Sequence, residues 1–104
     1  MGANFQEKGI SEEVSEIVDL VKNPQVKIEG EYLGKREFDG KKPGDINTLH
    51  MFRSSGKIIG AWGSKDLNDK LRGEEHKTVQ VSFKEKRDIG GGRTFKVFIV
   101  KVAA

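Results

Sequence analysis

Flat rings and long basic side chains recur together in the middle of this sequence. An aromatic ring can stack on a nucleic-acid base, and each stacked base contributes roughly 1–3 kcal/mol of binding. Lysine and arginine neutralise phosphates. The rings that could do this, on the strands expected to form a binding face, are Tyr32, Phe38, His50, Phe52 and Trp62.

The candidate phosphate-contacting residues are the basic side chains near these rings. They are Lys35, Arg36, Lys41, Lys42, Arg53, Lys57, Lys84, Lys86, Arg87 and Arg93. Many of them fall in two segments that we interpret as loops, 39–45 and 86–93. The alternative is that these lysines and arginines are only solvated, since basic residues also protect strand edges from aggregation. The run Gly90–Gly92 has no following helix and no P-loop ending, so it predicts a hairpin tip and not a phosphate cradle.

Residues for covalent or metal chemistry are sparse. The chain has no cysteine, no HExxH and no GxSxG, and its histidines, His50 and His76, fall in different elements. Asp39 and Asp45 beside Arg36 are the nearest approach to a nuclease site. We therefore expect no enzyme, no catalytic residue, no metal and no cofactor.

The elements that must position the rings are mostly strands. Ser11 is a suitable N-cap for a helix that ends at Asn23-Pro24, and Val14, Ile17, Val18 and Val21 form its apolar stripe. Alternating and glycine-punctuated patterns follow. They predict strands at 26–38, 46–53, 57–62, 78–85 and 94–102, and a short helix at 64–71 capped by Ser64.

Alternation decides which rings face outward. On the second strand we assign Leu49 and Met51 to the core, which places His50 and Phe52 on the outer face; the alternative is that Phe52 packs beneath the N-terminal helix. Trp62 is either a plug of the barrel or a stacking platform.

The remaining rings divide in the same way. The parity of Tyr32 suggests the core, but Gly30 and Gly34 make that parity unreliable. We assign Phe83 and Phe95 to the core and Phe98 to the outer surface or an interface.

Length and charge agree with one small domain. The 104 residues allow a single core. Residues 1–23 hold two basic and five acidic side chains, a net of −3, and residues 24–104 hold 17 basic and 11 acidic, a net of +6. A basic body favours a polyanionic partner. No apolar stretch is long enough to span a bilayer, and no secretory signal pattern begins the chain, so we expect a cytoplasmic protein that does not enter membranes.

The order of elements predicts the fold class. A long bent first strand, a helix between the third and fourth strands and a final hairpin describe a mainly β, five-stranded OB-fold barrel. We assign residues 24–104 to this barrel and residues 1–23 to an N-terminal extension with one amphipathic helix.

Three segments resemble OB-fold single-stranded DNA-binding proteins, most of all the small phage type. They are Gly30–Gly34, Leu49–Phe52, and Ile59–Ser64 running into Leu67 and Leu71. The likeness covers about three quarters of the chain, from Val26 to Val102. One departure is that the chain ends on a strand, whereas bacterial housekeeping relatives end in an acidic tail that recruits partners.

The resemblance implies sequence-tolerant binding of single-stranded DNA in replication, recombination or repair, in the host cytoplasm if the protein is phage-encoded. Replication or recombination proteins are further expected partners. The apolar stripe of the predicted N-terminal helix leads us to expect a homodimer. The alternative function is an OB-fold module for RNA or for a protein partner in a replication complex.

Overall fold

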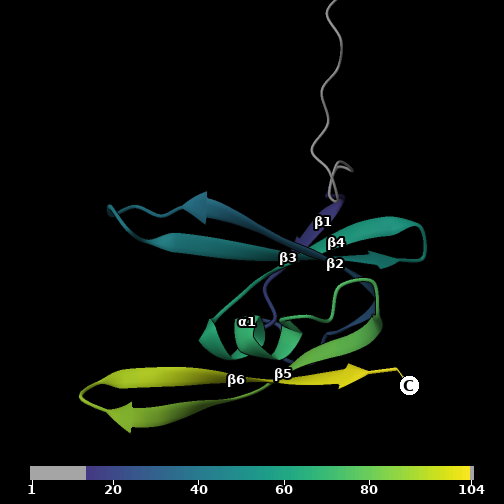
Figure 1. Ribbon diagram of the computed structural model, residues 1–104. Coiled ribbons are helices and arrows are strands. Elements are labelled where there is room, and N and C mark those ends of the chain that lie inside the picture. Colours follow the sequence, from purple (N-terminus) through teal and green to yellow (C-terminus); the bar gives the residue numbers. More distant parts are fainter. Residues whose placement is uncertain (1–13, 104) are drawn as a thin grey trace, which may run out of the picture.

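A computed structural model of the chain describes residues 14–103 and contains six strands and one helix (Figure 1). The strands are β1 (Glu16–Val18), β2 (Lys27–Asp39), β3 (Ile46–Ser54), β4 (Lys57–Trp62), β5 (Thr78–Gly90) and β6 (Arg93–Val102). The helix α1 (Lys65–Leu71) lies between β4 and β5. No helix in the described part of the chain is long and apolar enough to cross a membrane.

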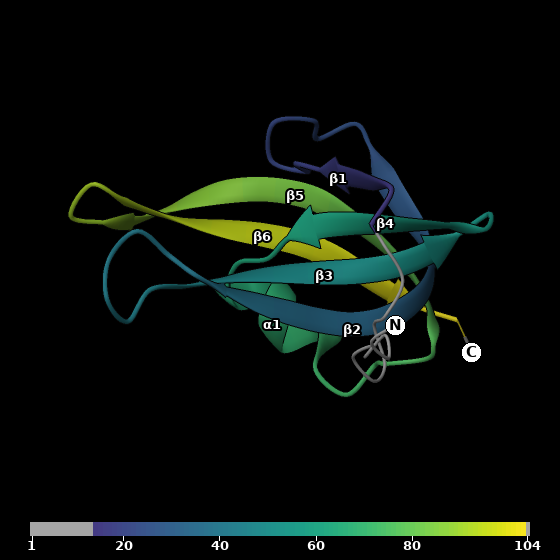
Figure 2. The ribbon, with the colours of Figure 1, turned by 90° about the horizontal axis from the view of Figure 1, so that it is seen from above.

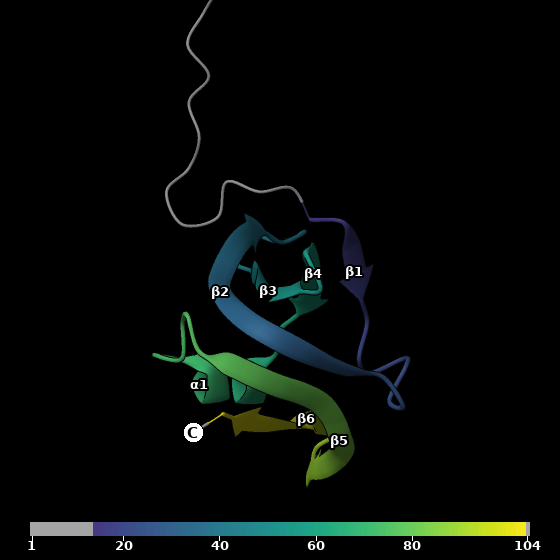
Figure 3. The same cartoon turned by 90° about the vertical axis from the view of Figure 1, so that its right-hand side faces the viewer.

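All six strands belong to one sheet, in the order β1-β4-β3-β2-β5-β6. Every neighbouring pair is antiparallel except β1 and β4, which are parallel. The sheet curls so that β1, β4, β3 and part of β2 form one layer and β5 and β6 form another, with α1 on the side of the opening between them (Figures 1 and 3). The protein is therefore mainly β and barrel-like.

The curl originates in β2, which changes neighbours along its length. Its first part, Lys27–Glu31, pairs with β5, and its second part, Glu31–Asp39, pairs with β3. Gly30 lies at the changeover, where a Cβ atom would collide with the carbonyl oxygen of Arg53. A side chain is excluded there by the close approach of two backbones, which agrees with the bent first strand predicted at 26–38.

The core fills the space between the two layers. Its largest buried side chains include Tyr32, Phe52, Leu67, Leu71 and Phe98. The two leucines are the apolar positions of α1, so the helix inserts its hydrophobic edge into the opening between the layers. At roughly 1.5–3 kcal/mol per buried leucine, this edge makes a large contribution to stability.

Polar contacts fix α1 to the free edge of β6. The backbone N–H of Phe98 donates to Oδ2 of Asp66 at 2.9 Å, and Nζ of Lys70 donates to the carbonyl oxygen of Phe98 at 2.6 Å. Burial raises the pKa of Asp66, but the Phe98 hydrogen bond and the contacts with Lys70 outweigh burial and leave that pKa below its usual value. The helix thus occupies the position where a neighbouring strand would pair with β6.

The prediction of five strands preceded by a helix was wrong for the residues that the structure describes. Residues 16–18 form a strand that pairs with Ile59–Ala61 of β4, and a turn follows in which Oδ1 of Asp19 accepts the backbone N–H groups of Val21 and Lys22. The edge of β4 provides backbone hydrogen-bonding groups for these residues, and a strand can pair with them whereas a helix cannot. The proposed cap, Ser11, lies outside the described residues. One argument for a homodimer disappears with the helix, and dimerisation stays a prediction.

The predicted pattern in β6 was also wrong. Phe98 is buried in the core against Phe83, with ring centroids 5.4 Å apart, and Phe95 is only half-buried. The register between β5 and β6 shifts between Phe83 and Glu85. In the observed register Phe98 lies opposite Phe83 on the core face. Its neighbour Val97 is buried as well, so strict alternation does not hold at this point of β6.

A buried polar chain links β2, β3 and α1. The hydroxyl of Tyr32 donates to Nδ1 of His50 at 2.7 Å, and Nε2 of His50 donates to Oδ1 of Asn68 at 2.6 Å. Burial raises the pKa of Tyr32 and, despite the bond to Asn68, lowers the pKa of His50. The neutral imidazole therefore satisfies both neighbours, which makes its burial tolerable.

The hydrogen bonds of Tyr32, His50 and Asn68 predict that the stability of the protein depends on pH. The unfolded state takes up a proton on His50 below about pH 6.5, while the folded state does not until the lower folded pKa is reached. The contribution of His50 to the melting temperature should therefore be constant well above pH 6.5 and be lost as the pH falls below about 6.5. His50→Gln should reduce this dependence, as followed by circular dichroism. His76→Gln, which alters the exposed histidine, should retain the slope, and a slope lost in His76→Gln alone would contradict the assignment.

Candidate nucleic-acid interface

Two hairpin arms project from the same side of the molecule (Figures 1 and 2). The β2–β3 arm comprises residues 35–48, with its loop at 40–45, and the β5–β6 arm comprises residues 84–96. Segment 86–93, predicted as a loop, instead continues the pairing of β5 with β6, and Lys86 lies opposite Lys96. The basic residues predicted there are therefore displayed on an ordered hairpin.

A groove of about 740 Å³ lies between these arms. One wall is the β2–β3 arm, with Lys35, Glu37 and Thr48, and Lys96 of the β5–β6 arm lies on the other side. The end of β4, the helix α1 with its flanking residues and the turn at Asp19 form the rest of the groove, with Trp62, Ser64, Lys65, Asn68, Asp69 and Arg72. Residues from five elements thus meet in one concave surface.

Charge in the groove is mixed, because three acidic residues, Asp19, Glu37 and Asp69, line it together with four basic ones. Asp69 lies 3.5 Å from Lys65 and 3.2 Å from Arg72, so it partly neutralises both. Lys35 and Lys96 form no ion pair with another described residue. These two lysines, one on each arm, are available for an external anion.

The β5–β6 arm carries an excess of positive charge. Its residues 84–96 include five basic and two acidic side chains, a net of +3. Lys86 and Lys96 are direct cross-strand neighbours, so they lie on the same face and repel each other. A repulsive pair has no structural benefit, and an anion placed between the two ammonium groups would convert it into an attractive site.

Two of the predicted rings are exposed beside this groove. Phe38 is 41% exposed and Trp62 is 42% exposed. Their rings meet edge to face, with centroids 6.0 Å apart and planes at 70°. Trp62 lies at the end of β4 and lines the groove, so it is not a plug of the barrel.

The other three predicted rings are buried. Tyr32 and Phe52 are cross-strand partners in the core, and His50 is bonded between Tyr32 and Asn68. The outer-face positions predicted for His50 and Phe52 were wrong, because both faces of β3 are covered in its middle and Leu49 and Met51 are buried as well. These three rings support the fold and present no surface to a base.

The predicted basic residues divide by position. Lys41 and Lys42 are exposed on the β2–β3 loop, and Arg36 is half-buried on β2. Arg53 lies at the far end of β3, where it pairs with Glu31 at 3.4 Å, so it is remote from the arms. On the β5–β6 arm, Lys84, Lys86 and Arg93 are exposed, and Arg87 pairs with Glu85 at 2.9 Å.

The sequence analysis did not identify several residues that line the groove: Ile46, Lys65, Asn68, Arg72 and Lys96. The helical ones are the polar positions of a short amphipathic helix, and such residues normally indicate nothing beyond solvent exposure. Lys96 offered a signal, because it is a lysine within an otherwise apolar strand run, 95–100.

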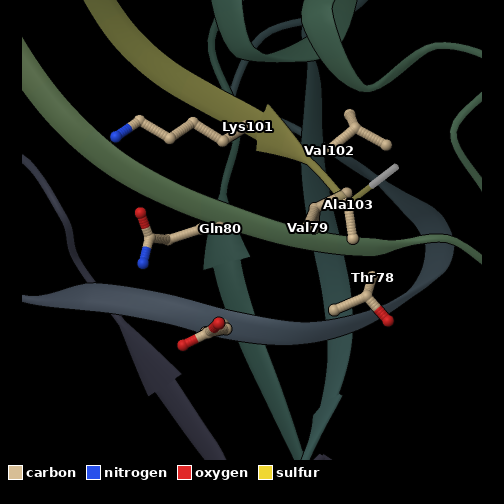
Figure 4. A pocket seen from close by; sticks show the side chains of 7 residues that line it. Thr78, Val79, Gln80, Lys101, Val102 and Ala103 are labelled. Carbon is tan, nitrogen blue, oxygen red and sulfur yellow. The ribbon is translucent and has the colours of Figure 1, made fainter.

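A smaller hollow of about 210 Å³ lies where β5 begins and β6 ends (Figure 4). Thr78, Val79, Gln80, Lys101, Val102 and Ala103 line it together with Glu29. It contains no ring, and its charged lining residues are one basic, Lys101, and one acidic, Glu29. Within residues 14–103 no group of three or more histidine, aspartate or glutamate side chains is arranged to hold a metal ion.

Comparison with known proteins adds nothing to this geometry: no family model, no curated protein and no solved structure matches the chain.

The cross-strand lysine pair predicts a trade-off between stability and binding. Lys96→Gln should raise the free energy of unfolding by up to about 1 kcal/mol, because it removes a like-charge repulsion that solvent only partly screens. The same change should weaken oligonucleotide binding and reduce the slope of log affinity against log salt by about 0.7, one phosphate contact. Thermal denaturation and fluorescence titration measure the two effects.

The matched control is Lys57→Gln, in the turn between β3 and β4 at the end away from the arms (Figure 1). It should alter neither quantity. Equal losses of affinity in both variants would mean that charge alone, and not the groove, determines binding.

Proposed function

We propose that this protein is an OB-type barrel that binds single-stranded DNA in the groove between its arms. The fold argument is the order β4-β3-β2-β5-β6 with a helix between β4 and β5, which matches a five-stranded OB barrel opened between its third and fifth strands. In this interpretation β1 is an addition at the edge of β4. The OB fold binds oligonucleotides on the face of its second and third strands and with two flanking loops, here at 40–45 and 90–92.

The observation that carries the proposal is the exposed Phe38–Trp62 pair beside an open groove, with a lysine on each arm that forms no ion pair within residues 14–103. Exposed rings of this size are costly in water unless a ligand covers them. Bases stack on such rings whatever their identity, while lysines follow the phosphates. The combination therefore favours a flexible polyanion with flat apolar groups.

The geometry favours a single strand over a duplex. A base can reach Trp62 only if it is unstacked from its neighbours, which a paired strand resists. Sequence-tolerant binding suits the protection of exposed strands in replication, recombination or repair, and the protein acts by binding alone.

Trp62 is the only tryptophan in the sequence, so its fluorescence emission can report DNA binding during a titration. Homopolymeric single-stranded DNA should quench the emission, and duplex DNA of equal length should bind more weakly. Log affinity should fall linearly with log salt, with a slope of about 0.7 per phosphate contacted. Equal affinity for the duplex would contradict the stacking model, and binding insensitive to salt would favour a protein partner.

Two aromatic substitutions separate the site from the core. Phe38→Ala should weaken binding by about 1–3 kcal/mol and leave the melting temperature nearly unchanged, because the ring is exposed. Phe52→Ala should lower the free energy of unfolding by about 3–5 kcal/mol, because it empties a fully buried site. At a temperature where Phe52→Ala is folded, its affinity should equal that of the parent protein. The reverse pattern would place the binding surface elsewhere.

A further inference from the structure

The tip of the β5–β6 arm exposes a branched apolar side chain. Ile89 is 58% exposed and belongs to no buried cluster. Its sequence neighbours from Lys84 to Arg93 are charged residues and glycines. An isoleucine in this place contributes little to folding, because it buries little apolar surface.

The local backbone directs this side chain away from the hairpin ladder. Asp88 lies opposite Thr94 and Gly90 lies opposite Arg93, so Ile89 is the extra residue of a β-bulge. A bulge re-aims the side chain that it carries. Oδ1 of Asp88 accepts the N–H of Gly90 at 2.9 Å, and Gly90, Gly91 and Gly92 close the turn with φ values of 91°, 63° and 72°, a conformation that favours glycine. The tip is therefore an ordered turn that exposes the apolar side chain of Ile89.

Basic residues flank the Ile89 side chain on both strands of the arm. Arg93 follows the turn, and Lys86 precedes the bulge on the same face as Lys96. Both lysines and Arg93 would contact a phosphate backbone and hold the tip against it. An apolar wedge flanked by cations is the combination with which proteins part stacked base pairs, at a cost of a few kcal/mol per step.

We propose that the β5–β6 arm inserts Ile89 between base pairs where a duplex meets a single strand, and so opens the duplex. This inference rests on the proposed function, because the groove between the arms must capture the strand that is released. The β5–β6 arm projects from the same side of the molecule as the β2–β3 arm (Figure 2), and residues of both arms line the groove. Binding of the released strand offsets the cost of unstacking, which is smallest at the end of a duplex.

The test uses a duplex with a single-stranded tail and 2-aminopurine in the base pair at the junction. Unstacking of this base raises its fluorescence. The parent protein should produce the rise at saturation, and Ile89→Thr should lose at least two thirds of it while its affinity for a single-stranded homopolymer changes less than twofold. Threonine keeps β-branching and removes the apolar surface, so the hairpin is preserved. Ile89→Leu should retain the rise.

The matched control is Ile17→Thr, which changes an isoleucine of similar exposure, 52%, on β1 at the other edge of the sheet. It should retain the full rise. An unchanged signal in Ile89→Thr, or an equal loss in Ile17→Thr, would overturn the wedge. A parent protein that binds the homopolymer without raising the junction signal would overturn the wedge alone, whereas failure to bind the homopolymer would overturn the proposed function.

Discussion

The divided pairing of β2 is the constraint on which the rest of the structure depends. One strand of 13 residues pairs with β5 at its start and with β3 at its end, and the two backbones approach closely at Gly30. β5 and β3 lie on opposite edges of β2, so this strand belongs to both layers, and its bend at Gly30 curls the sheet. The curl places the two hairpins in different layers, and the groove is the space between them. A side chain at position 30 would therefore affect the groove without touching it.

The helix α1 then holds the two layers at a fixed separation. On one side of the helix, Asn68 forms a hydrogen bond with His50 of β3. On the other side, Asp66 and Lys70 form hydrogen bonds with the backbone of Phe98 in β6. Leu67 and Leu71 fill the core between these contacts. The exposed side of the same helix presents Lys65 and Arg72 to the groove. Stability and the candidate site therefore share one short element, and changes in its buried positions should disturb both.

Much of the fold could be predicted from local patterns. The strands at 26–38, 46–53 and 57–62 and the helix at 64–71 are found within one or two residues, because alternation and turn residues specify them locally. The predicted cap was wrong, since the side chain of Ser64 forms no capping hydrogen bond. The segment 14–23 was misassigned because its apolar spacing suits a helix, while its strand depends on the distant edge of β4. The length of the β5–β6 arm was also missed, since charged residues and glycines resemble a loop until a pairing partner is known.

The candidate site could be predicted only in part. Trp62, Phe38 and the arm cations were identified by residue type, but His50 and Phe52 were placed on the wrong face. A histidine in a strand resembles a surface residue unless its partners, Tyr32 and Asn68, are known, and both lie 18 positions away. Lys65, Arg72 and Lys96 enter the site only through the docking of α1 against β6, which no local pattern contains.

Backbone and indole chemical shifts can show whether a single strand occupies the groove between the arms, as proposed. A nitrogen–proton correlation spectrum recorded during titration with a short thymidine oligonucleotide should show the largest changes at Lys35, Thr48, the Trp62 indole and Lys96. The turn at Ser54–Lys57 and the end of β6 should remain unchanged. Changes concentrated at that turn or around Lys101, with the groove signals unmoved, would contradict the account.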